Sequence, residues 1–315
     1  MSKKNKGYIP VMLTPFTESG AVDFDGLTKL TSLYLRAGAS GLFANCQSSE
    51  MFSLSGEEQL AVTNHVVRIA DGSVPVVATG TFGGPLQKQA DFVKRIYDTG
   101  VEAVIVITNM LAGESESAEL FDERFGKLLD ATPGIPLGFY ECPEPFKRVL
   151  TAEQLKRFVG TGRVIYHKDT CLDIEQIKAK LEATKGVANF GLYDAYMVHA
   201  VESLKAGSAG LSCIQGNYYP ELIVWLCNHY DNEALADQVE MVQRFFIDHM
   251  DIMHNVYPVV AKYFLQKRGL PISTFTRKHA GVFDEAVRKR MDSFYFQFRQ
   301  LLERIELIPD SIALS

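Results

Sequence analysis

Short apolar segments alternate with amphipathic segments along the first two thirds of the chain. Hydrophobic residues are continuous in the apolar segments, as in strands buried on both faces, whereas between them apolar residues recur every three to four positions, as on one side of a helix. The strand-like segments are residues 9–13, 41–46, 75–82, 103–108, 135–142, 164–167, 187–192 and 210–214.

The amphipathic segments carry helix-boundary signals. Short oxygen side chains precede several of them, where they can accept a hydrogen bond from a first-turn amide, and Glu or Gln often follows three residues later. These predicted N-caps are Asp23, Ser55, Thr151 and Asp173. Glycines follow other segments, where a left-handed residue often ends a helix. They include Gly38, Gly100 and Gly160.

Buried strands separated by single helices pair in parallel through crossover connections, and eight such units close a barrel. The alternative is an open doubly wound sheet, although no Gly-x-Gly-x-x-Gly motif opens the first helix. After the last strand only helical patterns remain, over residues 221–230, 234–249, 256–267 and 283–305. We therefore predict an α/β fold: a (β/α)8 TIM barrel over residues 7–230, with a C-terminal helical extension over residues 231–315 that packs on the barrel and is not an independent domain.

Composition narrows the functional classes. The 315 residues are 47% hydrophobic and 22% charged, values of a folded globular protein, and the formal net charge of −6 argues against nucleic acid as a partner. Five cysteines without a CxxC motif predict neither a disulfide framework nor a zinc site, so we expect a cytoplasmic protein without a metal. No run of about 18 apolar residues suggests a membrane span.

One lysine stands where a barrel enzyme places its chemistry. Active sites of such barrels lie at the carboxyl ends of the strands, and the sixth apolar segment ends in VIYHKDT, which contains Lys168. Because side chains alternate, Lys168 and Tyr166 share one face and His167 takes the other. Facing inward, Lys168 has a lowered pKa and becomes an amine nucleophile toward carbonyls; facing outward, it is an ordinary surface lysine.

Two neighbouring strand ends carry further polar groups. Tyr140 ends the fifth strand, where a phenol can transfer protons to and from a carbinolamine, or can be simply a packed aromatic. The second strand runs into the polar turn of residues 45–50, whose hydroxyls and amides suit a carboxylate, although most polar turns bind only water.

Taken in register, these segments resemble the dihydrodipicolinate synthase and N-acetylneuraminate lyase family of class I, Schiff-base-forming aldolases. The resemblance covers almost the whole chain. It rests on IPVMLTPFTESGAVDFDGL, the turn ending in Glu50, FYECP, VIYHKDT, GLYDA, AGSAGLSCIQGNYYPE and the C-terminal GLPIS.

The resemblance implies roles for several residues. Lys168 would condense with the carbonyl of a 2-keto acid, typically pyruvate, and Tyr140 would relay the proton and contact the carboxylate. Ser48 and Ser49 fall where the family's turn grips that carboxylate. Gly191 matches a glycine or serine beside the substrate.

The turn departs from the family pattern. Its flanking glycines are replaced by Cys46 and Ser49, and Gln47 stands in place of the first hydroxyl residue. Gln47 is therefore expected in the substrate site with a changed role.

Three further positions differ on the side of the second substrate. Leu111, preceded by Met110, takes the place of a tyrosine that completes the proton relay across a subunit interface in the family. Pro145 takes the place of the synthase's carboxylate-binding arginine, and Ser212 that of an isoleucine in the pyruvate pocket. We therefore predict that the Schiff-base half of the site is retained, that Ser212 and Leu111 line an altered substrate site, and that the protein is not a competent dihydrodipicolinate synthase.

Three functions follow as hypotheses. The first is a lyase or aldolase that acts through Lys168 on a 2-keto acid together with an aldehyde or sugar acid. The second is a dehydratase of a 2-keto-3-deoxy sugar acid that uses the same imine, and the third is a catalytically silent paralogue that binds a keto acid or a partner protein. The imine route needs no cofactor or metal, and the resemblance implies a homo-oligomer, a dimer or tetramer.

Overall fold

A computed structural model describes residues 6–307 of the chain. Eight parallel strands form one curled sheet in the order β1-β8-β7-β6-β5-β4-β3-β2. The strands are β1 (Gly7–Tyr8), β2 (Leu42–Phe43), β3 (Val76–Thr79), β4 (Ala103–Ile107), β5 (Leu137–Tyr140), β6 (Val164–Asp169), β7 (Gly191–Asp194) and β8 (Gly210–Leu211). The predicted α/β class and parallel strand order are confirmed.

The two edges of this sheet meet beyond β1. The Phe43 amide of β2 donates to the Pro10 carbonyl (3.0 Å), and the Met12 amide donates to the Phe43 carbonyl (3.1 Å). Since β1 itself pairs with β8, the eight strands form a closed, TIM-barrel-like ring rather than an open doubly wound sheet.

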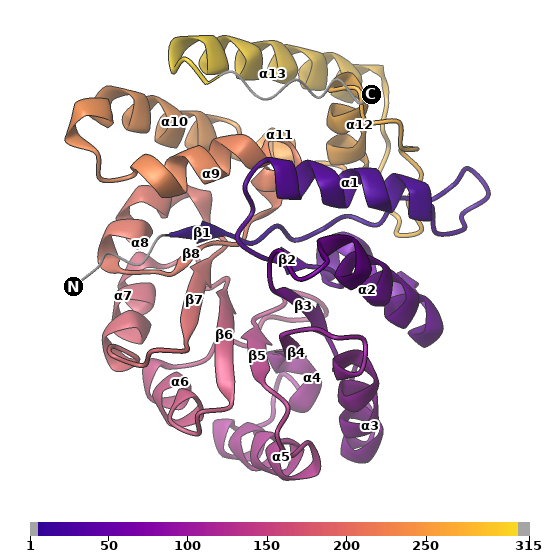
Figure 1. The fold of residues 1–315 in the computed structure, drawn as a ribbon, viewed down its shortest axis with the longest axis vertical. Helices are drawn as coiled ribbons and strands as arrows, with labels where there is room; N and C mark the ends of the chain where they lie inside the picture. The colour runs from indigo at the N-terminus through magenta and orange to yellow at the C-terminus, as the bar shows by residue number, and fades with distance from the viewer. Residues whose placement is uncertain (1–5, 308–315) are drawn as a thin grey trace.

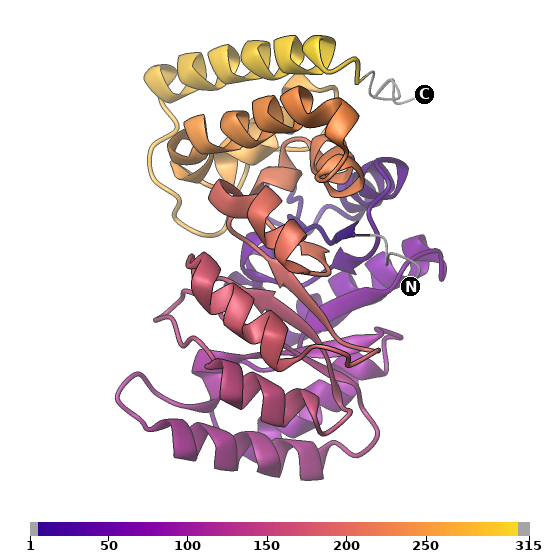
Figure 2. The same cartoon turned by 90° about the vertical axis from the view of Figure 1, so that its left-hand side faces the viewer.

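Helices surround this ring, and a further group follows the last strand (Figure 1). The helices between strands are α1 (Phe24–Arg36), α2 (Gly56–Ala70), α3 (Leu86–Tyr97), α4 (Thr108–Leu111), α5 (Ala118–Ala131), α6 (Ala152–Val159), α7 (Ile174–Ala183) and α8 (Ala200–Ala206). After β8 come α9 (Pro220–His229), α10 (Ala236–Asp248), α11 (Met250–His254), α12 (Val259–Lys267) and α13 (Glu285–Arg304). Figures 1 and 2 show this second group gathered at one end of the molecule.

The C-terminal helices pack on the rest of the chain through buried aromatic residues. Tyr218 and Tyr219, which precede α9, contact Phe264 of α12 and Phe294 of α13. The predicted division into a barrel and an extension at residue 230 stays a prediction. Within residues 6–307, every helix is too short or too polar to span a lipid bilayer.

The predicted helix starts are present. Asp23 accepts a hydrogen bond from the Gly26 amide, and Ser55 and Thr151 each form a capping box. Asp173 accepts from two first-turn amides of α7. These caps fix where each helix begins and hence the length of the loop that precedes it.

Several predicted boundaries are wrong. The run 9–13 contributes a single bridge at Val11, partly because Pro10 has no N–H to donate to a ladder. The seventh strand begins at Gly191 instead of 187, because Val187 is exposed in a turn after α7. Gly160 is right-handed (φ −60°), and the left-handed residue after α6 is Gly162 (φ 73°).

Two hydrophobic clusters separate the inside of the barrel from the outside. The inner cluster includes Phe43, Ile105, Tyr140 and Tyr166, whereas the outer cluster joins the strands to the helices. Alternate residues of each strand therefore face two different environments, and the chemistry of the site depends on which one a side chain enters.

Candidate active site

Lys168 lies inside the barrel, which is one of the two orientations that the strand alternation left open. It pairs in register with Tyr140 of β5, and its Nζ lies 4.1 Å from the centroid of the Tyr140 ring. The side chain is buried, and within residues 6–307 no carboxylate forms an ion pair with it. Burial lowers the pKa of Lys168, although the nearby thiols of Cys46, Cys142 and Cys213 act in the opposite direction.

The Tyr140 hydroxyl is bound by the polar turn. It donates to Gln47 Oε1 at 3.1 Å, and the Cys142 thiol approaches the same oxygen at 3.9 Å. Burial raises the pKa of Tyr140 well above its ordinary value and that of Cys142 to about 11, so both groups keep their protons at neutral pH. Gln47 is thus brought to the site, as a partner of Tyr140.

The two serines of the turn η1 (Gln47–Ser49) have different surroundings. The Ser49 hydroxyl is used within the protein: it donates to the Met12 carbonyl (2.7 Å) and accepts from the Cys46 amide (3.1 Å). Ser48 instead accepts a hydrogen bond from the Tyr257 hydroxyl (2.8 Å). Of the two predicted carboxylate ligands, the geometry therefore favours Ser48, while Ser49 shapes the turn.

Tyr257 was not found by sequence reasoning. The apolar pattern predicts a helix over residues 256–267, but α12 begins only at Val259, and Val256 has a left-handed backbone (φ 57°). This break between α11 and α12 brings the partly buried side chain of Tyr257 against the turn at Ser48. Nothing in the helical pattern signals it, because a left-handed valine is unusual.

The remaining predicted site residues are dispersed. The Ser212 hydroxyl lies inside the barrel, where it accepts from Tyr166 (3.2 Å) and donates to the Ile9 carbonyl (2.9 Å). Gly191 pairs with Tyr166, two residues before the level of Lys168, and lines a hollow of about 920 Å³ at the amino-terminal end of β7. Leu111 belongs to the outer cluster. The structure does not bring Gly191 or Leu111 to Lys168.

Apolar side chains follow three other strands at their carboxyl ends. Phe82 follows β3, Met110 follows β4 and Ile214 follows β8, and all three pack, partly buried, against the inner cluster that contains Tyr140. We call these three residues the apolar rim. Met110, next to the predicted Leu111, is the residue of that pair that reaches the inner cluster.

A second set of buried ionisable groups lies on the outer face of β5 and β6. The Lys180 ammonium of α7 contacts Glu141 Oε1 at 2.7 Å and Asp169 Oδ2 at 2.6 Å, and His167 Nε2 lies 3.4 Å from the same two oxygens. We call Glu141, His167, Asp169 and Lys180 the outer charge cluster. Burial alone would lower the pKa of Lys180, but the two carboxylates outweigh it and raise that pKa.

The outer charge cluster resembles a metal site in part. Ligand atoms of Glu141, His167 and Asp169 lie within 4.8 Å of one another. Since the Lys180 ammonium already contacts both carboxylates, these residues fit an ion-pair cluster better than a metal centre. This cluster was not identified by sequence reasoning. The available signal was the position of Lys180, three residues after Ile177 and therefore on the buried side of α7.

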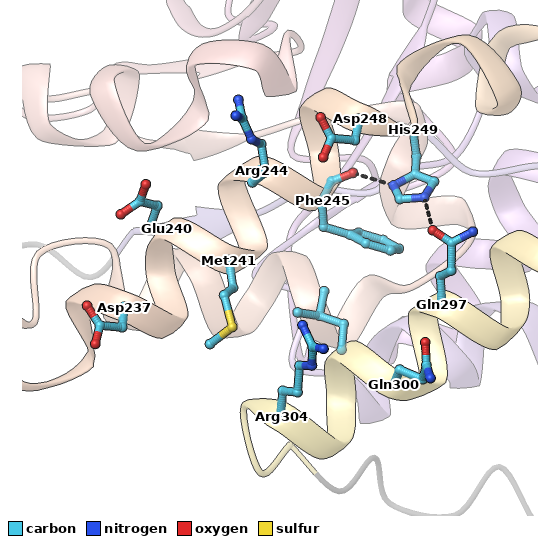
Figure 3. Close-up of a pocket in the computed structure, with 11 residues that line it drawn as sticks. Asp237, Glu240, Met241, Arg244, Phe245, Asp248, His249, Gln297, Gln300 and Arg304 are labelled. Atoms are coloured by element: carbon cyan, nitrogen blue, oxygen red, sulfur yellow. Dashed lines mark hydrogen bonds between the residues drawn. The ribbon is translucent and has the colours of Figure 1, made fainter.

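A separate groove lies between α10 and α13 (Figure 3). It measures about 530 Å³, and the ring of His249 in its wall donates a hydrogen bond to the Phe245 carbonyl (2.8 Å). The wall contains arginines and acids but no lysine, so it offers no amine for an imine. The predicted chemistry belongs to the barrel and not to this groove.

Comparisons with known proteins identify the family of the chain. The sequence matches the Dihydrodipicolinate synthetase family over residues 4–294. The chain belongs to this family. Among curated relatives, the 4-hydroxy-tetrahydrodipicolinate synthase of Methanothrix thermoacetophila is 25% identical over 272 residues, covering 86% of each chain, and that of Bacillus subtilis is 25% identical over 264 residues, covering 84% of this chain and 89% of the relative.

Solved structures share the fold. YagE, a prophage protein of the dihydrodipicolinic acid synthase family from E. coli K12 in complex with pyruvate, is 22% identical with a TM-score of 0.82 and covers 96% of this chain and 99% of its own. CdNal from Clostridium difficile in complex with mannosamine is 16% identical with a TM-score of 0.81 and covers 93% and 99%. The predicted family resemblance is confirmed, and the identities show a divergent member.

Proposed function

We propose that this protein is a lyase or aldolase that forms an imine between Lys168 and a 2-keto acid such as pyruvate. The observation that carries the proposal is the buried Lys168 amine, which lies over the Tyr140 ring and has no carboxylate partner in the part of the chain that the structure describes. A lysine in this environment is neutral more often than a solvated one, and only the neutral amine attacks a carbonyl. Family membership supports the same chemistry.

The proposed reaction uses few groups. The Lys168 nitrogen adds to the keto carbon, and the resulting carbinolamine expels its hydroxyl as water once that oxygen is protonated. Tyr140, hydrogen-bonded to Gln47, is the proton donor and later the acceptor. Loss of a proton from the third carbon gives an enamine, which forms a carbon–carbon bond to an aldehyde; the reverse sequence cleaves that bond. The covalent imine serves as electron sink, so no separate cofactor or metal is proposed.

The apolar rim bears on the second substrate. Phe82, Met110 and Ile214 offer few hydrogen-bonding groups to a chain of sugar hydroxyls, which favours an aldehyde with few hydroxyls over a sugar acid. A dehydratase of a 2-keto-3-deoxy sugar acid, the alternative, is therefore less well supported. A screen of pyruvate with apolar and polyhydroxylated aldehydes separates the two, and turnover of sugar acids alone contradicts this preference.

The site also differs from what aspartate semialdehyde requires. Pro145 offers no cation for the carboxylate of aspartate semialdehyde. The neighbouring cationic side chains already have partners within the protein. Lys147 donates to the Thr170 carbonyl, Arg148 donates to the Gly113 and Glu116 carbonyls, and Lys278 pairs with Glu144. We propose that condensation of pyruvate with aspartate semialdehyde is absent or very slow. Robust condensation overturns this proposal.

Borohydride trapping tests the central proposal. We expect incubation with pyruvate and borohydride to leave a reduced adduct on the peptide that contains Lys168, and none on Lys180 or Lys262, which are equally buried but paired with carboxylates. The absence of an adduct with any 2-keto acid favours the silent paralogue. Size measurement in solution tests the proposed homo-oligomer.

A further inference from the structure

A chain of buried polar side chains runs from the first helix to the carboxylate-binding turn. The Tyr34 hydroxyl of α1 lies 2.5 Å from Asn217 Oδ1, Asn217 Nδ2 lies 2.7 Å from the Tyr257 hydroxyl, and that hydroxyl lies 2.8 Å from Ser48 Oγ. The Tyr34, Asn217 and Ser48 side chains are buried, and the Tyr257 side chain is partly buried. Of these four groups, only Ser48 was considered above as a ligand of the substrate carboxylate, which leaves the other three groups without a role.

The direction of this chain is fixed by the backbone. Asn217 Nδ2 also lies 2.9 Å from the Val11 carbonyl, which can only accept, so this atom is the amide nitrogen and Oδ1 faces Tyr34. Tyr34 therefore donates to Oδ1, and Nδ2 donates to the oxygen of Tyr257. Tyr257 must in turn give its own proton to Ser48.

Ser48 is the open end of the chain. Its oxygen already accepts from Tyr257, and within residues 6–307 its own proton has no acceptor. Hydrogen bonds in such a series polarise one another, which makes the last hydroxyl a better donor. This donor belongs to the turn whose Gln47 binds Tyr140, and the Tyr140 ring lies against Lys168. A donor without an acceptor in that turn matches one carboxylate oxygen of a keto acid held by Lys168.

We propose that Tyr257 is a positioning residue that orients the Ser48 hydroxyl as a donor to the carboxylate of the keto acid. The inference rests on the proposed function, because the ligand is the one that Lys168 would bind. It adds that the C-terminal segment between α11 and α12 forms part of the substrate site. It also predicts that recognition depends on the negative charge of the ligand.

The test compares Tyr257→Phe with the wild-type chain. Calorimetric titration gives the pyruvate dissociation constant, and we expect it to rise about tenfold in the variant, since a hydrogen bond to a charged group is lost or weakened. Methyl pyruvate, the neutral ester, is expected to bind both proteins equally. A variant that binds pyruvate as tightly as the wild type, or that loses both ligands to the same extent, overturns the inference.

Two further variants separate positioning from general damage. Ser48→Ala is expected to weaken pyruvate binding as much as Tyr257→Phe does. The double variant is expected to weaken binding no more than either single variant, because Tyr257 acts through Ser48. Tyr219→Phe is the control: Tyr219 is a buried tyrosine whose hydroxyl contacts Met253 Sδ instead of the turn, and the loss of this hydroxyl should leave both affinities unchanged. An additive double variant contradicts the proposed role.

Failure of this inference differs from failure of the proposed function. Trapping at Lys168 with unchanged binding by Tyr257→Phe overturns the inference alone. Pyruvate binding that depends on Tyr257 without any trapped adduct supports the inference and overturns the enzyme proposal, and a wild-type chain that binds no pyruvate overturns both. If Tyr257→Phe does not fold, Asn217→Ala removes the donor that orients Tyr257 and is expected to weaken pyruvate binding severalfold.

Discussion

The inner and outer faces of β6 hold two buried lysines with opposite properties. Lys168 enters the barrel and lies over the Tyr140 ring, whereas Lys180 of α7 reaches the outer face and contacts Glu141 and Asp169. Both side chains are almost completely excluded from solvent. The pKa of Lys168 is lowered and that of Lys180 is raised, so burial by itself does not decide the charge of a lysine.

A third buried lysine lies between these extremes. Lys262 of α12 has one carboxylate partner, Glu50 Oε1 at 3.0 Å, and burial still lowers its pKa because the single ion pair does not offset the cost of desolvation. Among these three buried lysines, the pKa is thus lowered where the described residues supply no carboxylate or one, and raised where they supply two. The comparison supports the proposed nucleophilic role of Lys168 and a structural role for Lys180.

The largest expected effect is the loss of Lys168. Lys168→Met should abolish the borohydride-trapped pyruvate adduct completely, because among the buried lysines of residues 6–307 the other two, Lys180 and Lys262, are paired with carboxylates. Denaturation by urea is the control, and it should show unchanged or increased stability, since an unpaired buried amine is replaced by an apolar side chain. A persistent adduct contradicts the assignment.

A smaller loss of imine formation is expected when the Tyr140 hydroxyl is removed. Tyr140→Phe keeps the ring against Lys168 but removes the hydroxyl that donates to Gln47. We expect the rate of imine formation to fall by about 10²–10⁴-fold, the usual contribution of one proton-transfer group. Pre-steady-state trapping with pyruvate measures this rate, and an unchanged value excludes Tyr140 as the proton donor.

On the outer face, the same substitution should have the opposite consequence. Lys180→Met leaves Glu141 and Asp169 buried without their cation, and we expect a loss of about 3–5 kcal/mol in the free energy of unfolding. Adding Glu141→Gln and Asp169→Asn to this variant should restore part of the loss. If Lys180→Met is as stable as Lys168→Met, the distinction between the two faces is wrong.

The smallest effect concerns pH. Burial opposes a charge on His167, but Glu141 and Asp169 outweigh it and raise its pKa in the folded state. Because the His167 pKa is higher in the folded state, protonation of His167 stabilises the folded chain. This contribution is complete below the pKa of the unfolded state, about 6.5, and is lost as pH rises through the pKa of the folded state, by about 1.4 kcal/mol per pH unit.

Urea denaturation between pH 6 and pH 9 measures this dependence. The wild-type chain should lose more stability over this interval than His167→Asn, which has no titrating group at that position. Parallel curves for the two proteins mean that His167 does not change its protonation on folding.

The sequence alone predicted the order of eight strands, the capped helices and the shared face of Lys168 and Tyr166, because each depends on local periodicity or on the strict alternation of a strand. The inward direction of Lys168 was favoured only by the family resemblance. The sequence also placed Tyr140 beside Lys168, since neighbouring parallel strands end at the same edge. The family resemblance extended these assignments to the two serines of the turn of residues 45–50. In the structure, Ser49 donates to the Met12 carbonyl, whereas the Ser48 hydroxyl has no acceptor among the described residues.

Only the tertiary structure decided the partners of these groups. Tyr257 reaches Ser48 from 209 residues away, through a left-handed Val256 that no hydrophobic pattern encodes, and Lys180 meets Glu141 across 39 residues. The family resemblance places Leu111 and Gly191 beside the substrate, but the structure does not bring them to Lys168. Leu111 packs in the outer cluster, and Gly191 lies two residues before the level of Lys168 along its strand. Periodicity fixes which residues are buried, but the pairing of buried charges and hydroxyls depends on long-range packing.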